Sequence, residues 1–218
     1  MGAVKDLIIV GFSGFGKEVY WLATRLGIKV SGFLDDNADV HGEKFGDAQV
    51  LGCIDDWVKY SNSHFVIAIG SPRVRKKIFN KMKGNGNPEF ATLIDPDAIL
   101  NSEYVKVGKG SIVCAGTVCT VDVEIGQHVI INLNCTVGHD TIVDDFVTIA
   151  PMVAVSGNVH LFPLVEVGTG SCIRQGLNLE SGSMLGMGSV LTKNIKENVV
   201  FFGNPAKAFK TIPPDDLP

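Results

Sequence analysis

A six-residue repeat runs from Val107 to Lys196 and constrains the fold more than any other feature of the sequence. Divided into sixes, this stretch makes fifteen rows, and the first residue of every row is Val, Ile or Leu except at Cys119. The fifth residue is small or β-branched in nearly every row. A fixed short period is typical of a solenoid, in which each repeat packs only on its neighbours.

The period of six fits neither the 3.6-residue turn of a helix nor the simple alternation of a strand. Six residues supply one short strand and a corner, so three rows make a triangular coil of about eighteen residues, and the rows together make about five coils stacked ~4.8 Å apart. First-position side chains would point into the prism and fifth-position residues would fill its corners. Gly, Asn and Asp at second and fourth positions suit turns with unusual φ angles. The sequence therefore predicts a parallel β-helix, but not its hand.

The chain before the repeat, residues 1–95, predicts a small α/β unit with parallel strands. The apolar run at 6–10 indicates a buried strand. Helical periodicity follows over 17–27, with a glycine at its end, and the segment 29–36 indicates a second strand. The short spacing between these elements is typical of a strand–helix–strand unit.

The second half of this unit follows the same pattern. Residues 65–70 predict a third buried strand, residues 73–83 a basic helix, and residues 90–95 a further strand. We place the domain boundary near Asp95, so that the α/β domain covers 1–95 and the β-helix domain with its C-terminal tail covers 96–218.

The chain after the repeat is expected to add little to the core. The segment 197–203 predicts one more strand. The segment 203–210 is expected to form a short turn or helix. The residues from 211 onward are rich in Pro and Asp and are expected to be disordered.

Composition excludes several classes of protein. The net charge is −4 and the hydrophobic fraction 45%, without the basic stripe that a general nucleic-acid binder needs. No apolar run approaches the ~18 residues of a membrane span. The N-terminal apolar run leads directly into a motif and is interpreted as a first strand, not a signal peptide. Five cysteines without a C-x-x-C pair predict a reduced, cytoplasmic protein.

The glycine-rich turn from Gly11 to Gly16 lies between the first strand and the first helix. Free N–H groups and the helix dipole at such a turn favour an anion such as phosphate. The spacing is close to the dinucleotide fingerprint, and Asp35 stands about where a ribose-binding acid would be. However, the unit is too short for two mononucleotide halves. We therefore favour one nucleoside diphosphate over NAD, and a turn without any ligand remains an alternative.

These motifs together resemble the bacterial hexapeptide-repeat sugar acyltransferases, a family with nucleotide-aminosugar N-acetyltransferases and sialic acid O-acetyltransferases among its members. The shared features are the glycine turn, FLDD at 33–36, AIGSPRVRKK at 68–77 and the hexad repeat, so the resemblance covers nearly the whole chain. It implies a left-handed β-helix, acetyl-CoA as co-substrate and a first domain that binds a nucleotide-sugar. The positions that match substrate contacts are Gly11, Ser13, Gly14, Asp35, Asp36, Gly70 and Arg75. Phe15 departs from the histidine that the family often carries.

The resemblance also implies a catalytic pair. His139 matches the general base of the family and Asp140 matches an adjacent acid. A neutral imidazole with a pKa near ~6.5 is well suited to accept a proton at pH 7. Neighbouring residues on a strand point to opposite sides, so Asp144 or Asp145 remain alternatives to Asp140. The other prism histidines, at 128 and 160, are expected to face solvent.

Three further residues are assigned to the cofactor by the same resemblance. The backbone N–H of Gly157 would bond the thioester carbonyl, the alternative being a glycine required only by a prism corner. Thr148 stands where some relatives carry a second histidine that contacts the acetyl group. Lys207, in the sequence GNPAK, matches a segment that lies by the adenine and 3′-phosphate of coenzyme A in many relatives.

The function expected from these features is transfer of acetyl from acetyl-CoA to the amino group of a nucleotide-linked 4-amino-deoxy sugar in bacterial surface glycan biosynthesis. Acetylation of a sugar hydroxyl remains an alternative. We expect a homotrimer with its active sites between subunits. No metal is expected, because the zinc-binding prisms of γ-type carbonic anhydrases need a histidine triad, and the position five after His139 is Asp144. An ice-binding surface is disfavoured because Thr117 and Thr141 occupy inward corners.

Overall fold

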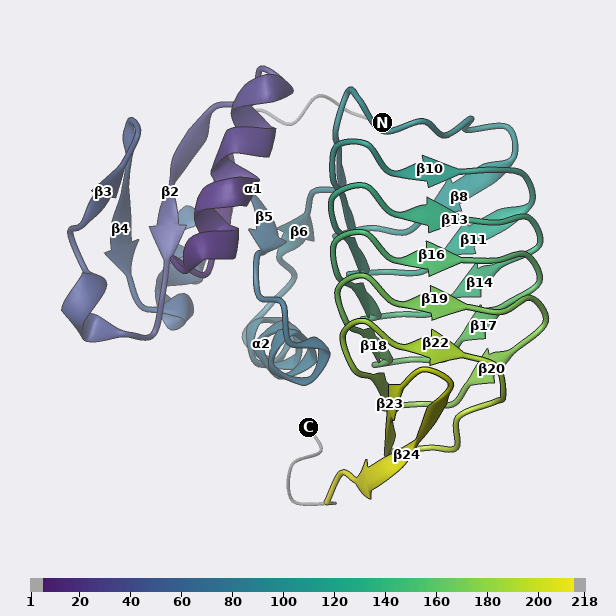
Figure 1. The fold of residues 1–218 in the computed structure, drawn as a ribbon. Coiled ribbons are helices and arrows are strands. Elements are labelled where there is room, and N and C mark those ends of the chain that lie inside the picture. Colours follow the sequence, from purple (N-terminus) through teal and green to yellow (C-terminus); the bar gives the residue numbers. More distant parts are fainter. Residues whose placement is uncertain (1–5, 214–218) are drawn as a thin grey trace.

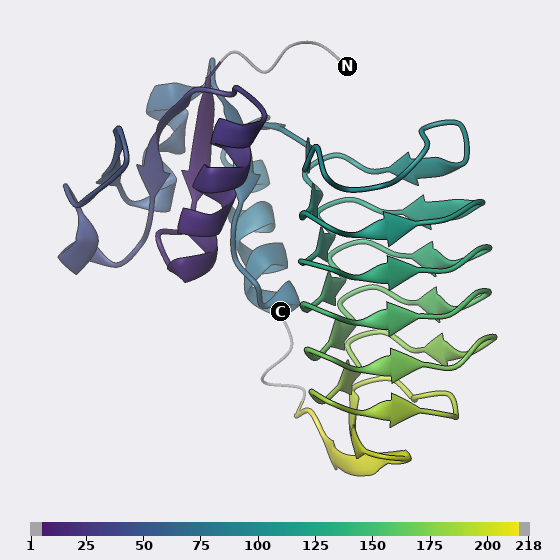
Figure 2. The same cartoon turned by 45° about the horizontal axis from the view of Figure 1, so that its top comes forward.

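The computed structural model of the protein describes residues 6–213. A small α/β unit packs against one side of a tall three-sided prism (Figure 1). In the tilted view the coils of the prism appear as stacked, nearly flat layers (Figure 2). The repeat of the sequence and the α/β pattern before it therefore form the two parts that were expected.

The α/β unit is built on one twisted sheet in the order β3-β4-β2-β1-β5-β6. All neighbouring strands run parallel except the edge pair β3 and β4, a hairpin that the sequence did not indicate. The strands are β1 Leu7–Val10, β2 Val30–Leu34, β3 Lys44–Phe45, β4 Ala48–Gly52, β5 His64–Ile67 and β6 Glu89–Phe90. The helices are α1 Gly14–Arg25, α2 Pro72–Gly84 and the 3-10 turns Ala38–Val40 and Ile54–Tyr60.

Strand β1 lies at the centre of this unit, and its four apolar residues are fully buried. Alternate side chains of a strand point to opposite faces of its sheet. Accordingly Leu7 and Ile9 belong to a cluster with α1, and Ile8 and Val10 belong to a cluster with α2. The cluster on the α1 side continues into the prism, so the two units share one apolar core.

The prism has three parallel sheets, each named here after one of its strands. The β13 sheet contains β10 Val118–Cys119, β13 Thr136–Val137, β16 Ala154–Val155, β19 Cys172–Ile173 and β22 Val190–Leu191. The β14 sheet contains β8 Val105–Val107, β11 Val123–Ile125, β14 Ile142–Val143, β17 His160–Leu161 and β20 Asn178–Leu179. The β15 sheet contains β7 Leu93–Ile94, β9 Ile112–Val113, β12 Ile130–Ile131, β15 Thr148–Ile149, β18 Glu166–Val167, β21 Met184–Leu185, β23 Val199–Gly203 and β24 Ala206–Thr211.

Stacked strands pair at an offset of eighteen residues, as in Ile131 with Ile149, so each coil consists of three rows of the repeat. From Val113 to Leu191 the first-position residues are buried, and the fifth-position residues from Ser111 to Ile195 are buried as well. The expected inward and corner positions are thereby confirmed. The apolar column they form is the core of the prism.

The corners of the prism depend on a left-handed backbone conformation at the fourth position of each row. Positive φ angles recur every six residues from Gly110 to Gly188, and they include non-glycine residues such as Asp140. Glycine is required at second positions for a different reason. A Cβ on Gly138 would lie 2.6 Å from the backbone nitrogen of Gly157 in the next coil. Glycine is therefore required there by the close stacking of coils and not by φ.

The two ends of the prism differ from the sequence-based expectation. The single strand expected over 90–95 is wrong: β6 belongs to the α/β sheet, whereas β7 pairs with β9 and already forms part of the prism. The prism thus begins at Leu93. At the other end, the expected turn or helix over 203–210 is instead β24, antiparallel to β23. The expected disorder of the tail falls mostly on residues outside those described.

One buried guanidinium joins the α/β unit to the prism. Arg75 of α2 is 1% exposed, and all three of its side-chain nitrogens donate hydrogen bonds. The acceptors are the carbonyls of Ile69 (2.6 Å) and Gly70 (3.1 Å) in the α/β unit, the carbonyls of His128 (2.8 Å), Phe146 (2.8 Å) and Val147 (3.1 Å) in the prism, and the hydroxyl of Thr148 (2.9 Å). Burial lowers the pKa of Arg75 to about 9, so the group is still charged at pH 7.

An aromatic cluster surrounds this contact. The ring of His128 stacks on the ring of Phe146, with 5.1 Å between the two ring centroids. Its centroid lies 4.7 Å from that of Phe79 and 4.6 Å from that of Phe90. The expectation that His128 faces solvent is therefore wrong, and burial lowers its pKa to about 4. His128 and Phe146 both have positive φ, a conformation that costs side-chain-bearing residues about 1–2 kcal/mol. Their packing against α2 offsets that cost.

Replacing Arg75 tests this contact. In Arg75→Ala the prism carbonyls would lose their only charged donor, and each buried polar group left unsatisfied costs about 1–3 kcal/mol. We expect the free energy of unfolding to fall by roughly 3 kcal/mol or more, and amide exchange in α2 to accelerate. Lys77→Ala, on the exposed side of the same helix, is the matched control. Equal thermal stability of the two variants would show that Arg75 does not hold the units together.

Candidate active site

The expected site residues lie in two separate places. His139, Asp140 and Gly157 lie at the corners that follow β13 and β16. The glycine turn, Gly70 and Thr148 lie where the α/β unit meets the β15 sheet. In Figure 1 the corner between β13 and β14 is on the side of the prism away from the α/β unit. A single chain therefore does not bring the two groups together.

His139 and Asp140 form a hydrogen-bonded pair, with 2.7 Å between Nδ1 and Oδ2. The positive φ of Asp140 places this pair in a corner and not in a strand, so the alternation of strand side chains does not separate them. Because an ionised carboxylate can only accept, Nδ1 carries the proton and Nε2 keeps its lone pair. In this tautomer Nε2 is the ring nitrogen that can accept a proton.

The alternative acids are engaged elsewhere. Asp144 bonds Nε2 of His160 at 2.9 Å, and Asp145 accepts the backbone N–H of Gln127 at 2.7 Å. His160 is half-buried and its ring stacks on Phe162. The prediction that His160 faces solvent is therefore only partly correct. Asp140 is thus the acid that orients His139.

Gly157 stacks directly on His139 in the next coil. A Cβ at this glycine would lie 2.5 Å from Nε2 and 2.6 Å from Cε1 of His139. Among residues 6–213, nothing accepts a hydrogen bond from the Gly157 N–H. The glycine therefore leaves room for the ring of His139 and keeps a free N–H donor beside it.

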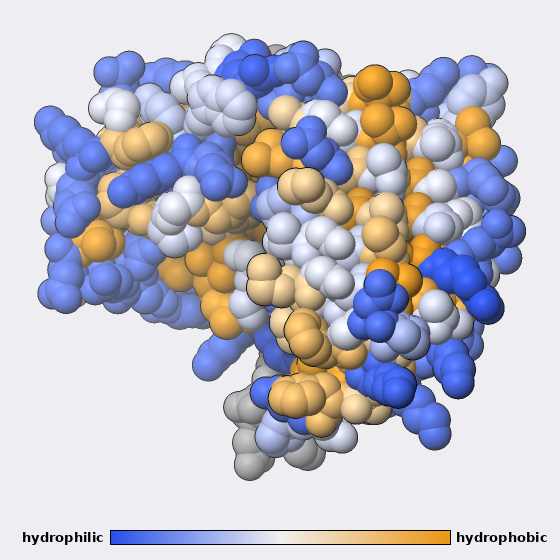
Figure 3. Space-filling view, viewed as in Figure 1, coloured by the Kyte–Doolittle hydropathy of each residue, from blue (hydrophilic) through white to orange (hydrophobic). Residues whose placement is uncertain are grey.

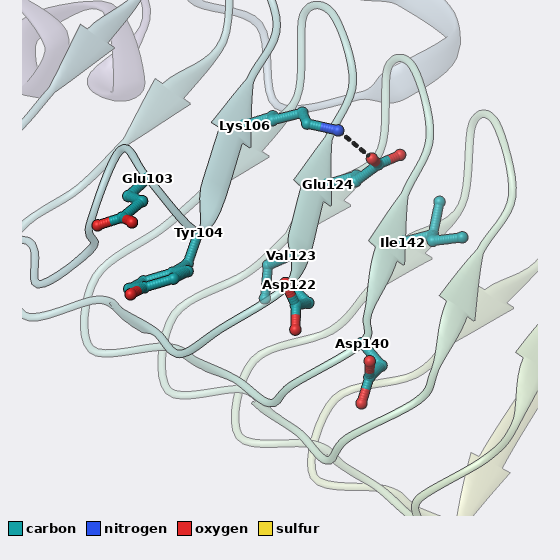
Figure 4. A pocket seen from close by; sticks show the side chains of 8 residues that line it. All are labelled: Glu103, Tyr104, Lys106, Asp122, Val123, Glu124, Asp140 and Ile142. Carbon is teal, nitrogen blue, oxygen red and sulfur yellow. Dashed lines mark hydrogen bonds and ion pairs between the residues drawn. The ribbon is translucent and has the colours of Figure 1, made fainter.

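The His139–Asp140 pair is open to solvent in a single chain. The side chains of His139 and Asp140 are 55% and 59% exposed. Asp140 also lines a hollow of about 390 Å³ on the β14 sheet (Figure 4). Its other lining residues are Glu103, Tyr104, Lys106, Asp122, Val123, Glu124 and Ile142, with an ion pair between Lys106 and Glu124. The solvent-exposed surface around His139 and Asp140 cannot by itself exclude water from a reaction.

The glycine turn has the close approach that the sequence indicated. Gly11 has a φ of 108°, and a Cβ on Gly16 would collide with the Gly11 carbonyl. Ser13 is the exposed N-cap of α1, and its side chain makes no capping hydrogen bond. Nothing lies within 4 Å of the Cβ position of Gly14. The first N–H groups of α1 are therefore accessible to an anion.

The two acids expected to bind substrate also shape this region. Asp35 accepts the N–H groups of Phe12 (2.7 Å) and Asn37 (2.9 Å). Asp36 accepts the N–H of Ile54 at 2.9 Å and pairs with Lys81 at 3.2 Å. Both carboxylates thus hold the ends of the parallel strands in place.

A cavity of about 260 Å³ separates the glycine-turn helix from the β15 sheet. It is lined by Phe15, Glu18, Gly70, Ile130, Asn132, Thr148, Ala150 and Glu166. The Thr148 hydroxyl donates to the Gly70 carbonyl at 2.7 Å and accepts from Arg75. Of the residues expected to contact ligands, Gly70 and Thr148 line this cavity, whereas Arg75 is used in the contact between the two units.

Lys207 lies apart from both groups. It is exposed on β24 and borders a hollow of about 260 Å³ together with Lys193, Phe201 and Pro205. Strand β24 is separated from β15 by β18, β21 and β23 in the same sheet. Two lysines at one end of the prism are suited to bind phosphate as point charges.

Residues 6–82 match the family model described as the PglD N-terminal domain. The acetyltransferase domain of PglB from Neisseria gonorrhoeae FA1090 is 31% identical, with 94% of this chain and 100% of that chain covered and a TM-score of 0.86.

The chain belongs to the hexapeptide-repeat acyltransferase family.

Other relatives agree with this assignment. PerB from Caulobacter crescentus, solved with CoA and GDP-perosamine, is 26% identical, covering 95% of this chain and 99% of that one with a TM-score of 0.86. GDP-perosamine N-acetyltransferase from Escherichia coli O157:H7 is 28% identical over 71% of each chain. An acyl-carrier-protein-dependent UDP-N-acetylglucosamine O-acyltransferase from Pseudomonas aeruginosa is 25% identical, but the match spans only 49% of that protein.

Membership confirms the left-handed β-helix that the resemblance implied. In residues 6–213, no helix is long and apolar enough to cross a membrane. The same residues contain no group of three or more His, Cys, Asp or Glu side chains placed to hold a metal ion.

The polar wall of the cavity was not predicted from the sequence. Glu166 belongs to the outward column of the β15 sheet, in register with Thr148 and Met184. The sequence does contain a feature that could have indicated it. Glu166 is the one charged residue among the sixth-position residues of the rows that form this sheet, which are Ile112, Ile130, Thr148, Glu166 and Met184. Its significance depends on knowing which prism face the α/β unit covers.

Gly157→Ala tests the stacking of glycine on the catalytic ring. The backbone of Gly157 is not in the left-handed region, so alanine is tolerated there and the added Cβ must displace His139. We expect kcat to fall at least tenfold, since small misplacements of a base cost this much or more. Thermal stability should change little. Gly84→Ala, where a Cβ meets nothing within 4 Å, is the control, and an unchanged kcat would contradict the assignment.

Proposed function

We propose that the protein transfers acetyl from acetyl-CoA to the amino group of a nucleotide-linked 4-amino-deoxy sugar used in bacterial surface glycans. The observation that supports this most is the His139–Asp140 pair against Gly157 on the β-helix. Relatives that match nearly the whole chain have been solved with acetyl coenzyme A, or with CoA and GDP-perosamine. Both classes of substrate are therefore represented among them.

The geometry at His139 supports direct transfer between two bound substrates. The free amine of the sugar attacks the thioester carbon, the C–N bond forms and the nitrogen becomes cationic. Nε2 of His139 removes the proton, and the Gly157 N–H stabilises the oxyanion. The C–S bond then breaks and the thiolate of CoA leaves with a proton from the imidazolium. Holding both substrates together supplies much of the rate, so no acyl-enzyme is required.

The cysteines are poor candidates for a nucleophile. Cys114, Cys119 and Cys135 are buried, and burial raises their pKa values to about 12, 12 and 11. A thiol must ionise to attack a thioester. Cys172 is exposed on the β13 sheet, away from the corner that holds His139.

We propose that the complete active site forms between subunits of a homotrimer. His139 is exposed and lies across the prism from the cavity beside Thr148, so a second copy must join the two halves. The β13 sheet presents an outward column without any charge: Val118, Thr136, Ala154, Cys172 and Val190. Figure 3 shows this face as a pale to orange band. Closed threefold symmetry would give three equal sites.

The remaining binding roles follow from this arrangement. The N-terminus of α1, with Gly11, Ser13 and Gly14, would hold the diphosphate of the nucleotide-sugar. Asp35 and Asp36 would support that turn. Lys207 would contact a phosphate of CoA at the end of the prism. We place the enzyme in the cytoplasm, in keeping with its five free cysteines.

A thermal-shift screen of UDP-, GDP- and dTDP-linked 4-amino sugars with acetyl-CoA would test the function, followed by mass spectrometry of the product. An amide product survives hydroxylamine, whereas an O-acetyl ester is cleaved by it. A hydroxylamine-labile product would favour the hydroxyl acceptor instead. Stabilisation by NAD without a response to any nucleotide-sugar would contradict the proposal.

His139→Ala is expected to lower kcat by roughly 10²–10⁴-fold, the usual contribution of a general base. The affinity for acetyl-CoA should change little, because the imidazole acts on the acceptor amine. His160→Ala is a matched control, since His160 also pairs with an aspartate on the prism. Near-normal turnover of His139→Ala in steady-state assays, or a trapped acetyl-cysteine, would exclude the mechanism.

A mixing experiment tests the site between subunits. His139→Ala lacks the base, and Ala150→Trp would fill the cavity beside Thr148. If each site takes its base from one subunit and its cavity from the next, trimers co-refolded from equal amounts of the two inactive variants regain about a quarter of wild-type activity. Each variant refolded alone is the control. A mixture as inactive as its components, or a monomer in light scattering, would contradict the proposal.

A further inference from the structure

Glu166 stands out on the wall of the cavity between the α/β unit and the prism. It lies on β18, in the outward column of the β15 sheet, and is half-buried. Its carboxylate receives no hydrogen bond and forms no ion pair within residues 6–213. Partial burial of a carboxylate without a hydrogen-bond donor disfavours its charged form. A ligand that supplies donors would relieve that cost.

The surroundings of Glu166 favour a donor ligand. Burial raises the pKa of Glu166, while Arg73 and Arg75 act in the opposite direction. All three nitrogens of Arg75 are occupied by oxygen acceptors other than Glu166. Arg75 therefore contributes charge at a distance and does not compete with a ligand for the carboxylate.

The other polar groups of the same wall are already engaged. The Thr148 hydroxyl donates to Gly70 and accepts from Arg75. The side-chain oxygen of Asn132 accepts the backbone N–H of Leu133 at 2.7 Å. Glu166 is thus the strongest acceptor left on the prism side of the cavity.

The two sides of the cavity differ in the charge that they favour in a ligand. Its α/β side is formed by Phe15 and Glu18 of α1 and by Gly70. Glu18 is exposed, and the N-terminus of the same helix, where N–H groups and the helix dipole favour an anion, lies beside the cavity. Its prism side carries Glu166, which repels a phosphate. A ligand that fits both ends has an anionic group at one end and hydrogen-bond donors or a cation at the other. A nucleoside diphosphate joined to an amino sugar has this distribution.

We propose that Glu166 binds the amino group of the acceptor sugar and selects an amine over a hydroxyl. This inference rests on the proposed function. The sugar amine is partly protonated at neutral pH and binds the carboxylate as an ammonium ion. After it releases one proton to solvent, the neutral amine still donates an N–H to the carboxylate and keeps its lone pair for the thioester. As the C–N bond forms, the nitrogen becomes cationic, and the carboxylate stabilises that charge until His139 of the neighbouring subunit takes the proton. A hydroxyl, which is not a cation in the free ligand, gains less from the same contact.

The test compares Glu166→Gln with wild type by calorimetry on the intact protein. The probes are UDP-, GDP- and dTDP-linked 4-amino sugars, each with its free nucleoside diphosphate and with the 4-hydroxy sugar analogue. Hydrogen bonds to charged groups are stronger than neutral ones, so we expect the Kd for the amino sugar to rise about 10- to 100-fold. The Kd values for the free diphosphate, the 4-hydroxy analogue and acetyl-CoA should stay within about twofold.

Two further variants control for structure. Glu197→Gln removes an exposed carboxylate elsewhere on the prism and should leave every Kd unchanged. Glu166→Leu removes the carboxylate without adding a polar group and should reproduce the selective loss.

The outcomes separate the two proposals. Equal affinity of wild type and Glu166→Gln for the amino sugar would overturn the role of Glu166 alone. An equal loss of affinity for the free diphosphate and the amino sugar would do the same, because it would indicate a general disturbance of the cavity. Failure of the wild type to bind any of the amino sugars would overturn the proposed function together with this inference.

Discussion

The left-handed backbone at the fourth position of each row is the constraint on which the prism depends. Without a corner every six residues, the short strands could not close a coil of eighteen, and no coil can bury its apolar residues alone. Much of the repeat uses Asn, Asp or Gly there, which adopt this conformation at low cost. His128, Phe146, Met152 and Leu164 are exceptions. His128 and Phe146 pack against Phe79 of α2, whereas Met152 is 65% exposed. Two of these departures from the repeat therefore lie where the second unit docks.

The same corner geometry produces the hydrogen-bonded pair of His139 and Asp140. A histidine and an aspartate adjacent in sequence would point apart on a strand, but the positive φ of Asp140 brings its carboxylate to Nδ1 of His139. The stacking of coils then sets Gly157 against the ring. The arrangement is thus a consequence of the period of eighteen, which places Gly157 of the next coil directly against the ring of His139.

The contact between the two units creates the cavity. Arg75 reaches from α2 to backbone oxygens on both units, and Thr148 links the prism to Gly70. These contacts fix the distance between the N-terminus of α1 and the β15 sheet. A buried cation held by carbonyl dipoles in this way is sensitive to the loss of any partner. The cavity and its Glu166 wall therefore depend on a residue that the sequence had assigned to substrate.

The sequence alone determined the β-helix, because a period of six leaves few ways to bury every first-position side chain. It also indicated the α/β unit, the glycine turn and, by resemblance, His139 and Gly157. It could not decide whether Asp140, Asp144 or Asp145 orients the base, since that depends on the φ angle of one corner. Nor could it find the buried position of His128, the role of Arg75 or the half-buried position of Glu166 in the cavity wall. Those depend on which face of the prism the α/β unit covers, and only long-range packing sets that choice.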